Sequence, residues 1–261
     1  RRTTAEAPAP PTAIGIAAAG PLDVRTGAFL TPSNLPELHG FGVCDFLRAA
    51  TGLPVALEND AQAAALGECA HGALAGVRDA LVLTLGTGVG SGVIAHGRIW
   101  RAGHQTGPEL GHVYLGSTLG VRCGCGQVGC AETWLQKAAL KRLFEQQGLT
   151  FKSLPELDPL IAAGDPRTAK ALKIYGHRLG LLLSSLAVVG YKSIGLSGGL
   201  SRLAPHFLAA ARRTLEWRLA KRPWLLPSRI EPSPDPERSA LWGMAALLSE
   251  RRQYGVEHAE E

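Results

Sequence analysis

Residues 107–134 read GPELGHVYLGSTLGVRCGCGQVGCAETW and bring together His112, Cys123, Cys125 and Cys130. One histidine and three thiolates form a complete tetrahedral ligand set for zinc. Three of the five cysteines of the chain lie here, and the glycines between them permit the tight turns that bring short side chains onto one ion. The stretch therefore predicts a zinc loop.

Two alternatives remain for these cysteines. They could be reduced and buried, because free cysteine is among the most buried residue types. They could also form disulfides, although Cys123 and Cys125 are too close in sequence to bridge easily and nothing else indicates an oxidising compartment. The clustering in a glycine-rich loop favours the metal over both.

Carboxylates flank the predicted ligands. Glu109 precedes His112 by three residues, so the two side chains would share one face of a helical turn. Glu132 follows the last cysteine at the start of an expected helix over 132–146. These positions indicate a zinc that does structural work and holds Glu109, His112 and Glu132 in place for a polar ligand. The alternative for each glutamate is a solvated helix end.

The composition sets wider limits. With 261 residues, 46% hydrophobic and 19% charged, the chain can build one large soluble domain or two lobes. The net charge of +5 is scattered along the chain, so charge does not indicate nucleic-acid binding. The apolar run 179–189 is too short to cross a bilayer, and the first residues are not a signal peptide. We therefore expect a cytoplasmic protein.

Strands and helices alternate along the chain, which is typical of an α/β fold. The sequence predicts a hairpin at 26–27 and, after the zinc loop, a Pro-rich crossover over 223–236. The expected strands cover 12–18, 54–58 and 79–85, one follows residue 92, and another covers 193–196. The expected helices cover 43–51, 61–74, 132–146, 166–190, 202–218 and 239–248, and the charged tail is 251–261.

Three strand ends carry chemistry. Asp60 follows a strand and opens a helix, so it is either an N-cap or a catalytic group beyond a strand end. The glycine segment 86–92 lies between two expected strands, which excludes the dinucleotide fingerprint and the Walker loop because both need a helix next. Its backbone N–H groups can still bind phosphate, although an ordinary hairpin is the alternative. Ser197-Gly198-Gly199 follows a third strand and suits either a nucleotide or close packing.

Together these motifs resemble the ROK family (repressor, open reading frame, kinase). The matching segments are LENDAQAAALGE at 57–68, LTLGTGVGSGVI at 83–94, GRIWRAGHQTGPELGH at 97–112, CGCGQVGCAE at 123–132 and IGLSGGLS at 194–201. Their order and spacing fit the family over nearly the whole chain. The combination is far more specific than any one motif.

The resemblance implies an actin-like ATPase (ribonuclease H-like) fold with two α/β lobes, and an ATP-dependent hexose kinase of the glucokinase-like branch. It implies a small lobe over 1–75, a large lobe with the zinc loop over 76–235, a helix over 236–250 that returns to the small lobe, and a tail over 251–261. The expected partners are a hexose or N-acetylhexosamine, ATP with Mg²⁺, and a second copy in a homodimer.

The resemblance also assigns roles to residues. Asp60 is the implied general base, and the implied sugar ligands are Asn59, Asp60, Glu109, His112 and Glu132. The implied structural zinc is held by His112, Cys123, Cys125 and Cys130. The implied nucleotide-binding residues are Gly86, Thr87, Gly88, Gly90, Gly198 and Gly199.

The chain departs from the family pattern at two places. The Asp-x-Gly-Gly-Thr phosphate loop and the strands after it are missing, and the chain begins at Arg1 rather than Met, so we expect an N-terminal lobe without its first strands. Phosphate transfer is then expected to need that loop upstream. Pro108 also stands where glycine is usual, which could shift Glu109. The alternative function is a non-catalytic sugar-sensing regulator, a transcriptional repressor module, although no helix-turn-helix pattern precedes Thr12.

Overall fold

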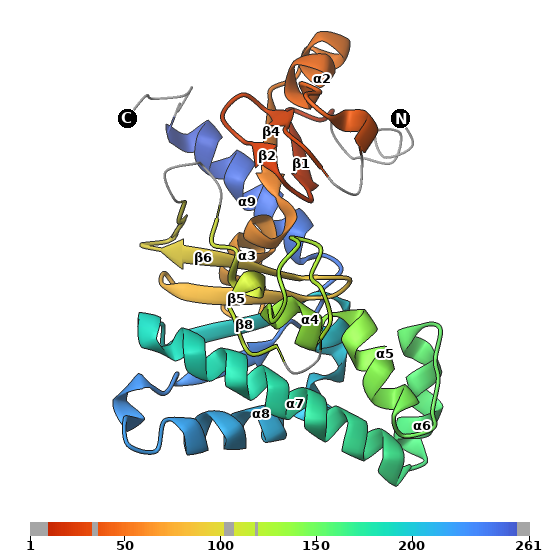
Figure 1. Cartoon of the computed structure of the whole chain (residues 1–261). Coiled ribbons are helices and arrows are strands. Elements are labelled where there is room, and N and C mark those ends of the chain that lie inside the picture. Colours follow the sequence, from red (N-terminus) through yellow and green to blue (C-terminus); the bar gives the residue numbers. More distant parts are fainter. Residues whose placement is uncertain (1–9, 33–35, 102–106, 118–119, 255–261) are drawn as a thin grey trace.

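The computed structural model of the chain describes residues 10–32, 36–101, 107–117 and 120–254. Figure 1 shows a stack of layers: a small sheet lies at one end, two crossing helices come next, then a large sheet, and a helix pair covers its far face. Residues 1–9 and 102–106 lie outside the described residues, and so do residues 255–261 of the predicted tail.

The large sheet has five strands in the order β7-β6-β5-β8-β9. Strands β5, β8 and β9 run parallel to one another, and β6 pairs antiparallel with both β5 and β7. The strand bounds are β5 Ala80–Leu85, β6 Val89–Ala95, β7 Arg98–Ile99, β8 Ser193–Ser197 and β9 Arg229–Pro232. The strand predicted after residue 92 is thus confirmed as β6, although it begins earlier, at Val89.

The small sheet pairs β1 (Ile14–Ala18) in parallel with β4 (Val55–Asn59). The predicted hairpin is present as β2 (Leu22–Asp23) and β3 (Ala28–Phe29), and α2 (Val43–Thr51) packs beside it. A separate small core forms here from Leu22, Phe29, Cys44, Val55 and Leu57. This end of the molecule therefore has apolar packing of its own.

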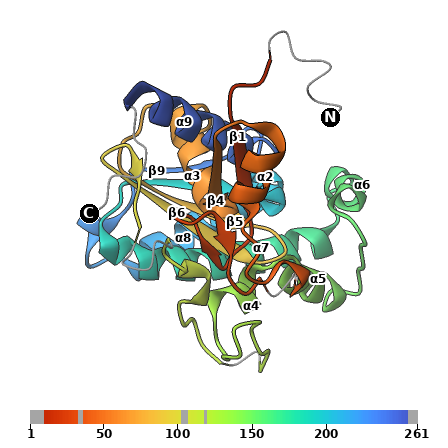
Figure 2. The same cartoon turned by 90° about the horizontal axis from the view of Figure 1, so that it is seen from above.

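Two helices connect the small sheet to the large one. Helix α3 (Asp60–Ala70) packs on β5 and β6, and α9 (Ser239–Tyr254) crosses α3 and also packs on β1. Figure 2 shows α3 and α9 together beside β1 and β4. The last helix is longer than the predicted 239–248, because the helix continues into the first residues of the predicted tail.

The far face of the large sheet is covered by α7 (Pro166–Leu186) and α8 (Ala204–Arg218). Gly176 permits their close approach, since a Cβ there would lie 2.2 Å from the carbonyl oxygen of Phe207. With the turn after it, α7 is long and apolar enough to cross a membrane. However, 61% of its most apolar stretch is buried inside the fold. It is the central core helix of the large layer.

Several predicted boundaries were wrong for physical reasons. The single helix expected over 132–146 is two helices, α4 (Ala131–Leu135) and α5 (Lys137–Glu145). Gln136 between them is extended, and the next N–H, of Lys137, donates to the Gly86 carbonyl at 2.7 Å instead of continuing a helix. The predicted helix 166–190 ends at Leu186 in a 3₁₀ turn over Ala187–Val189, and the one at 202–218 begins as a 3₁₀ turn over Gly199–Leu203.

Other elements were not predicted at all. The Pro-rich crossover contains the edge strand β9 and the 3₁₀ turn Pro223–Leu225. Residues after α5 form a 3₁₀ turn, Leu154–Leu157, and the short helix α6 (Asp158–Ala162). The remaining 3₁₀ turns are Pro36–Leu38 and Leu110–His112.

Candidate active site

The first residues of β6 hold several parts of the predicted site at one place. The Val89 N–H donates to Glu132 Oε2 at 3.0 Å. The Val89 carbonyl oxygen lies against Gly111, where a Cβ would come within 2.0 Å of it. Gly111 stands between Glu109 and His112, so a single residue of β6 contacts both the Glu132 helix and the segment that carries Glu109 and His112.

Ser91, two residues further along β6, fixes the backbone on both sides of Glu109. Its hydroxyl donates to the carbonyl oxygen of Pro108 and accepts from the N–H of Leu110 at 3.0 Å. Ser91 is 5% exposed, so both bonds are shielded from water. Pro108, which was expected to shift Glu109, is thus part of a hydrogen-bonded segment. Sequence reasoning missed Ser91, although it lies inside a matched motif.

The N-terminus of α3 packs against the same strand. A Cβ at Gly90 would lie 2.8 Å from Ala61 Cβ, so glycine is needed for the helix to approach β6 this closely. The predicted N-cap role of Asp60 was wrong: Asn59 is the cap, and its Oδ1 accepts from the N–H groups of Ala61 and Gln62. The Asp60 carboxylate is exposed at the helix start, and its Oδ1 also accepts from the Ala61 N–H at 2.8 Å.

A buried ion pair, also missed, lies directly behind this helix start. Arg101 Nη2 donates to Glu58 Oε2, and Glu58 Oε1 accepts from the Asn59 N–H at 2.8 Å. Glu58 is fully buried and Arg101 is 19% exposed in its side chain. Replacing one partner of such a pair is strongly destabilising, because the other charge is then buried without a counter-charge. It ties the strand before Asp60 to the segment after β7.

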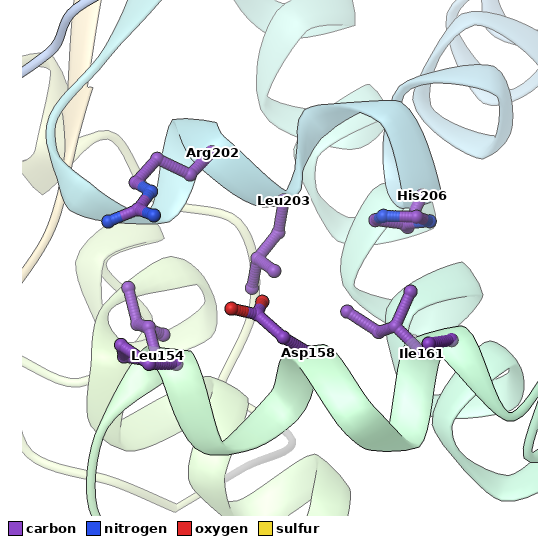
Figure 3. Close-up of a pocket in the computed structure, with 8 residues that line it drawn as sticks. Leu154, Asp158, Ile161, Arg202, Leu203 and His206 are labelled. Atoms are coloured by element: carbon purple, nitrogen blue, oxygen red, sulfur yellow. The ribbon is translucent and has the colours of Figure 1, made fainter.

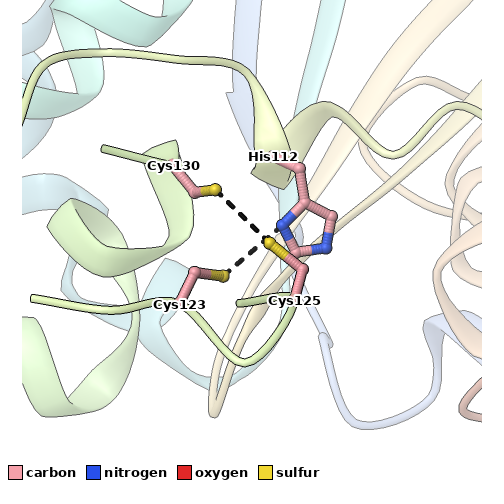
Figure 4. A group of neighbouring side chains, drawn as sticks. All are labelled: His112, Cys123, Cys125 and Cys130. Atoms are coloured by element: carbon pink, nitrogen blue, oxygen red, sulfur yellow. Dashed lines mark hydrogen bonds between the residues drawn. The ribbon is translucent and has the colours of Figure 1, made fainter. Parts of the chain in front are cut away.

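The four predicted metal ligands converge. The Nδ1 atom of His112 and the Sγ atoms of Cys123, Cys125 and Cys130 all lie close together (Figure 4). Their ligand atoms are within 4.8 Å of one another. The distance from Cys123 Sγ to His112 Nδ1 is 3.5 Å, and that from Cys125 Sγ to Cys130 Sγ is 3.6 Å.

These distances fit a tetrahedral zinc. With bonds of ~2.3 Å to sulfur and ~2.0 Å to nitrogen, neighbouring ligand atoms around zinc lie roughly 3.5–3.8 Å apart. Without a metal, burial raises the pKa of the Cys123 thiol to about 12, whereas a hydrogen bond from the Gln127 backbone lowers the pKa of Cys125. Burial thus favours the neutral Cys123 thiol, and a bound cation would be needed to hold this side chain as a thiolate.

Both nitrogens of His112 have neighbours. Nδ1 faces the thiols, and Nε2 lies 3.9 Å from Glu109 Oε2. Glu132 also faces two ways, because its Oε1 lies 3.3 Å from Cys123 Sγ while Oε2 accepts from Val89. The four predicted zinc ligands and the two carboxylates thus lie in one connected group.

The two glycine segments end neighbouring parallel strands. Strands β5 and β8 pair in the register Thr84 opposite Ser197, so the turn 86–88 and Gly198-Gly199 follow the same edge of the sheet. Gly198 has φ +76°, and a Cβ there would lie 2.6 Å from the Leu85 carbonyl oxygen. The predicted loop 86–92 is shorter than expected, because Gly90 and Gly92 belong to β6 and pack against α3.

A cavity of about 220 Å³ adjoins this edge. Figure 3 shows it between α6 and the start of α8, with the Asp158 carboxylate pointing into the space between the two elements. Leu154 reaches from the cavity towards Gly199, where a Cβ would lie 3.7 Å from its Cδ1. The other lining residues are Pro155, Ile161, Ala162, Arg202, Leu203 and His206. Sequence reasoning missed this wall because it identified neither α6 nor its turn.

Residues 3–251 match the model of the ROK family. The chain therefore belongs to the ROK family. It is 31% identical to a glucokinase of Thermotoga maritima, over 91% of this chain and 79% of that enzyme. The predicted membership is thereby confirmed.

Solved structures agree with this assignment. A ROK hexokinase from Thermus thermophilus is 33% identical and superimposes with a TM-score of 0.80, covering 96% of this chain and 84% of that one. A ROK family glucokinase from Streptomyces griseus, in complex with glucose and AMPPNP, is 27% identical with a TM-score of 0.77, covering 90% and 80%. These relatives confirm the predicted α/β fold of the actin-like ATPase class.

Proposed function

We propose that this protein is an ATP-dependent hexose kinase of the ROK family, with Asp60 as the general base. The glucokinase and hexokinase relatives support the reaction class. The observation that carries the assignment of residues is the arrangement around the start of β6. There Val89, Gly90 and Ser91 contact Glu132, the α3 start and the Glu109 segment in turn.

The chemistry proceeds from these positions. The Asp60 carboxylate accepts the proton of a sugar hydroxyl while that oxygen attacks the γ-phosphorus of ATP in line, and ADP leaves with the bond electrons. Asn59, Glu109, His112 and Glu132 hold the remaining hydroxyls. Paired carboxylates and amides suit a sugar, since each unsatisfied buried polar group costs about 1–3 kcal/mol. The acceptor is a hexose or an N-acetylhexosamine.

Zinc is the proposed structural cofactor. His112, Cys123, Cys125 and Cys130 would hold it, and its role is to fix the loop so that His112 presents Nε2, and Glu132 its carboxylate, to the sugar. The support is the match between the observed ligand separations and tetrahedral zinc geometry. The free imidazole nitrogen beside Glu109 also fits the usual pairing of a metal-bound histidine with a carboxylate.

ATP is proposed to bind at the edge where β5 and β8 end. Backbone N–H groups of Thr87 and Gly88 would face the phosphates, because the Gly86 N–H donates to the Gly88 carbonyl oxygen and Gly90 belongs to β6. Gly198 and Gly199 would pack against the adenosine. The cavity beyond Gly199 supports this placement of the adenosine, because Leu154 and Leu203 offer the adenine base apolar walls. Mg²⁺ would arrive with ATP and neutralise phosphate charge.

The organisation of the molecule follows from this site. We place the small lobe at 1–75, the large lobe at 76–235 and the returning helix at 236–250, with α3 and α9 as the joint between lobes and 251–261 as the tail.

A homodimer in the cytoplasm is the proposed state. Analytical ultracentrifugation at micromolar concentration checks the dimer, which a sedimentation coefficient of a monomer would contradict.

The function is tested by coupled ADP release in the full-length protein with a panel of glucose, mannose, N-acetylglucosamine and N-acetylmannosamine. We expect one sugar to give ADP release that depends on both sugar and ATP. A protein that binds a sugar by calorimetry but never releases ADP with any of them would instead be a sugar-sensing regulator, and the kinase assignment would be wrong.

A further inference from the structure

A buried chain of hydrogen bonds joins the helix that starts at Asp60 to the strand end that precedes Gly198. Its centre is the hydroxyl of Ser239, the first residue of α9, which is fully buried. This hydroxyl donates to Glu68 Oε1 on α3. It lies 3.0 Å from the Ser197 hydroxyl, which donates to it, and 3.2 Å from the Ser233 hydroxyl.

The Ser239 hydroxyl is saturated by these partners. A hydroxyl has one hydrogen and two acceptor lone pairs. Its hydrogen faces Glu68 Oε1 and, at 3.2 Å, the Asp235 carbonyl oxygen, while Ser197 donates to it and the Ser233 hydroxyl lies 3.2 Å away. The second oxygen of Glu68 accepts from the N–H of Ala73 at 2.9 Å. Removing Ser239 therefore leaves the buried Glu68 Oε1 without the hydroxyl that donates to it.

Helices α3 and α9 pack at their crossing with no side chain between their backbones. A Cβ at Gly67 would lie 1.9 Å from the Ser239 carbonyl oxygen, and a Cβ at Gly243 would lie 1.7 Å from the Ala63 carbonyl oxygen. The backbones of α3 and α9 are thus in direct contact at their crossing. The Ser239 hydroxyl ties this pair of helices to the large sheet through Ser197.

Helix α3 is consequently held at both ends. Near its start, Ala61 and Ala65 pack on Gly90 and Gly92 of β6. Near its end, Glu68 is bonded to Ser239. Eight residues separate Asp60 from Glu68, which is about 12 Å of helix. The bond at Glu68 therefore fixes the tilt of the α3 axis, and with it the direction in which the Asp60 end of the helix faces Gly198-Gly199.

We propose that Glu68, Ser239 and Ser197 form a positioning relay that fixes the Asp60 carboxylate relative to the phosphoryl donor bound at Gly198-Gly199. The inference rests on the proposed kinase function. Ser197 connects directly to the nucleotide junction, since it is the last residue of β8. Misplacement of reacting groups by about 1 Å can cost ~10²-fold in rate, so loss of the relay lowers kcat while sugar binding is retained.

The test compares three variants of the full-length protein. Ser197→Ala removes the link between the relay and the nucleotide junction, and Ser239→Ala removes every bond of the central hydroxyl. Ser184→Ala is the matched control, because its buried hydroxyl bonds only to the Leu181 carbonyl oxygen within α7. For each variant, kcat is measured by ADP release, the hexose Kd by calorimetry and stability by thermal unfolding.

We expect Ser197→Ala to lower kcat roughly 10-fold to 10²-fold, with hexose Kd within about twofold of wild type. Ser239→Ala should lower kcat at least as far, whereas Ser184→Ala should keep the wild-type kcat. Equal kcat in Ser197→Ala and wild type at a temperature where both are folded overturns the relay and leaves a purely structural network. A wild-type protein with no hexose-dependent ADP release would instead overturn the kinase function on which the relay rests.

Discussion

At the scale of single residues, the site depends on groups that carry no chemistry themselves. Ser91 fixes the backbone around Glu109, and Asn59 is the N-cap of the helix that begins at Asp60. Sequence reasoning identified the carboxylates, the histidine and the thiolates because their types and spacing indicate chemistry. It missed Ser91 because a serine inside a strand pattern has no distinctive partner until Pro108 and Leu110 are placed beside it.

Ser91→Ala is expected to weaken hexose binding while leaving zinc content unchanged. The variant leaves the Leu110 N–H and the Pro108 carbonyl without their shared partner, at a cost of about 1–3 kcal/mol, and the Glu109 backbone loosens. Hexose Kd measured by calorimetry should rise roughly tenfold. Ser185→Ala, whose exposed hydroxyl bonds within α7, is the control and should match wild type. An unchanged hexose Kd in Ser91→Ala would show that Ser91 does not position Glu109 for sugar binding.

At the scale of elements, the sequence predicted most strands and helices but misjudged where tertiary contacts interrupt them. The apolar pattern over 132–146 is continuous, yet Lys137 bonds to Gly86 and splits the helix. Strand β9 ends at Pro232, is flanked by Pro227 and Pro234, and pairs with β8 along one edge, so its sequence shows only a weak strand pattern. The contact between Glu132 and Val89 spans 43 residues, and no local pattern encodes it.

The zinc loop is the element whose removal should have the widest effect. Cys125→Ser removes one thiolate and is expected to abolish zinc binding, lower the melting temperature and weaken hexose binding, because His112 and Glu132 lose their anchor. Elemental analysis of chelator-free protein gives the metal content. Cys69→Ser changes a cysteine on α3 outside the cluster and should retain one zinc per chain. One zinc per chain in Cys125→Ser as well would contradict the ligand assignment.

At the scale of the whole molecule, the two glycine segments and the cavity lie at one edge of the large sheet, where we propose that ATP binds. The proposed sugar ligands lie near β6 and at the start of α3. The sequence predicted this division through the order of its motifs, whereas the cavity wall from α6 and α8 required the fold. The joint formed by α3 and α9 also emerged only in three dimensions, since Gly67 and Gly243 lie far apart in sequence.

Ala162→Phe places a ring in the cavity beyond Gly199 and is expected to compete with the base of ATP. The KM for ATP should rise by about tenfold, the equivalent of ~1.4 kcal/mol, and hexose Kd should stay the same. Ala163→Phe adds the same ring at the next, exposed position, which does not line the cavity. An equal KM for ATP in the two variants would place the nucleotide base elsewhere.

The central claim is that Asp60 accepts the proton of the sugar hydroxyl. The most direct measurement is hexose-dependent ADP release by Asp60→Asn in the full-length protein, together with hexose binding by calorimetry and with Asp45→Asn on the exposed face of α2 as the control. The account predicts a fall in kcat of ~10²–10⁴ with hexose Kd within a few-fold of wild type, because the amide keeps the shape and loses the base. Asp60→Asn that turns over at the rate of Asp45→Asn would contradict it.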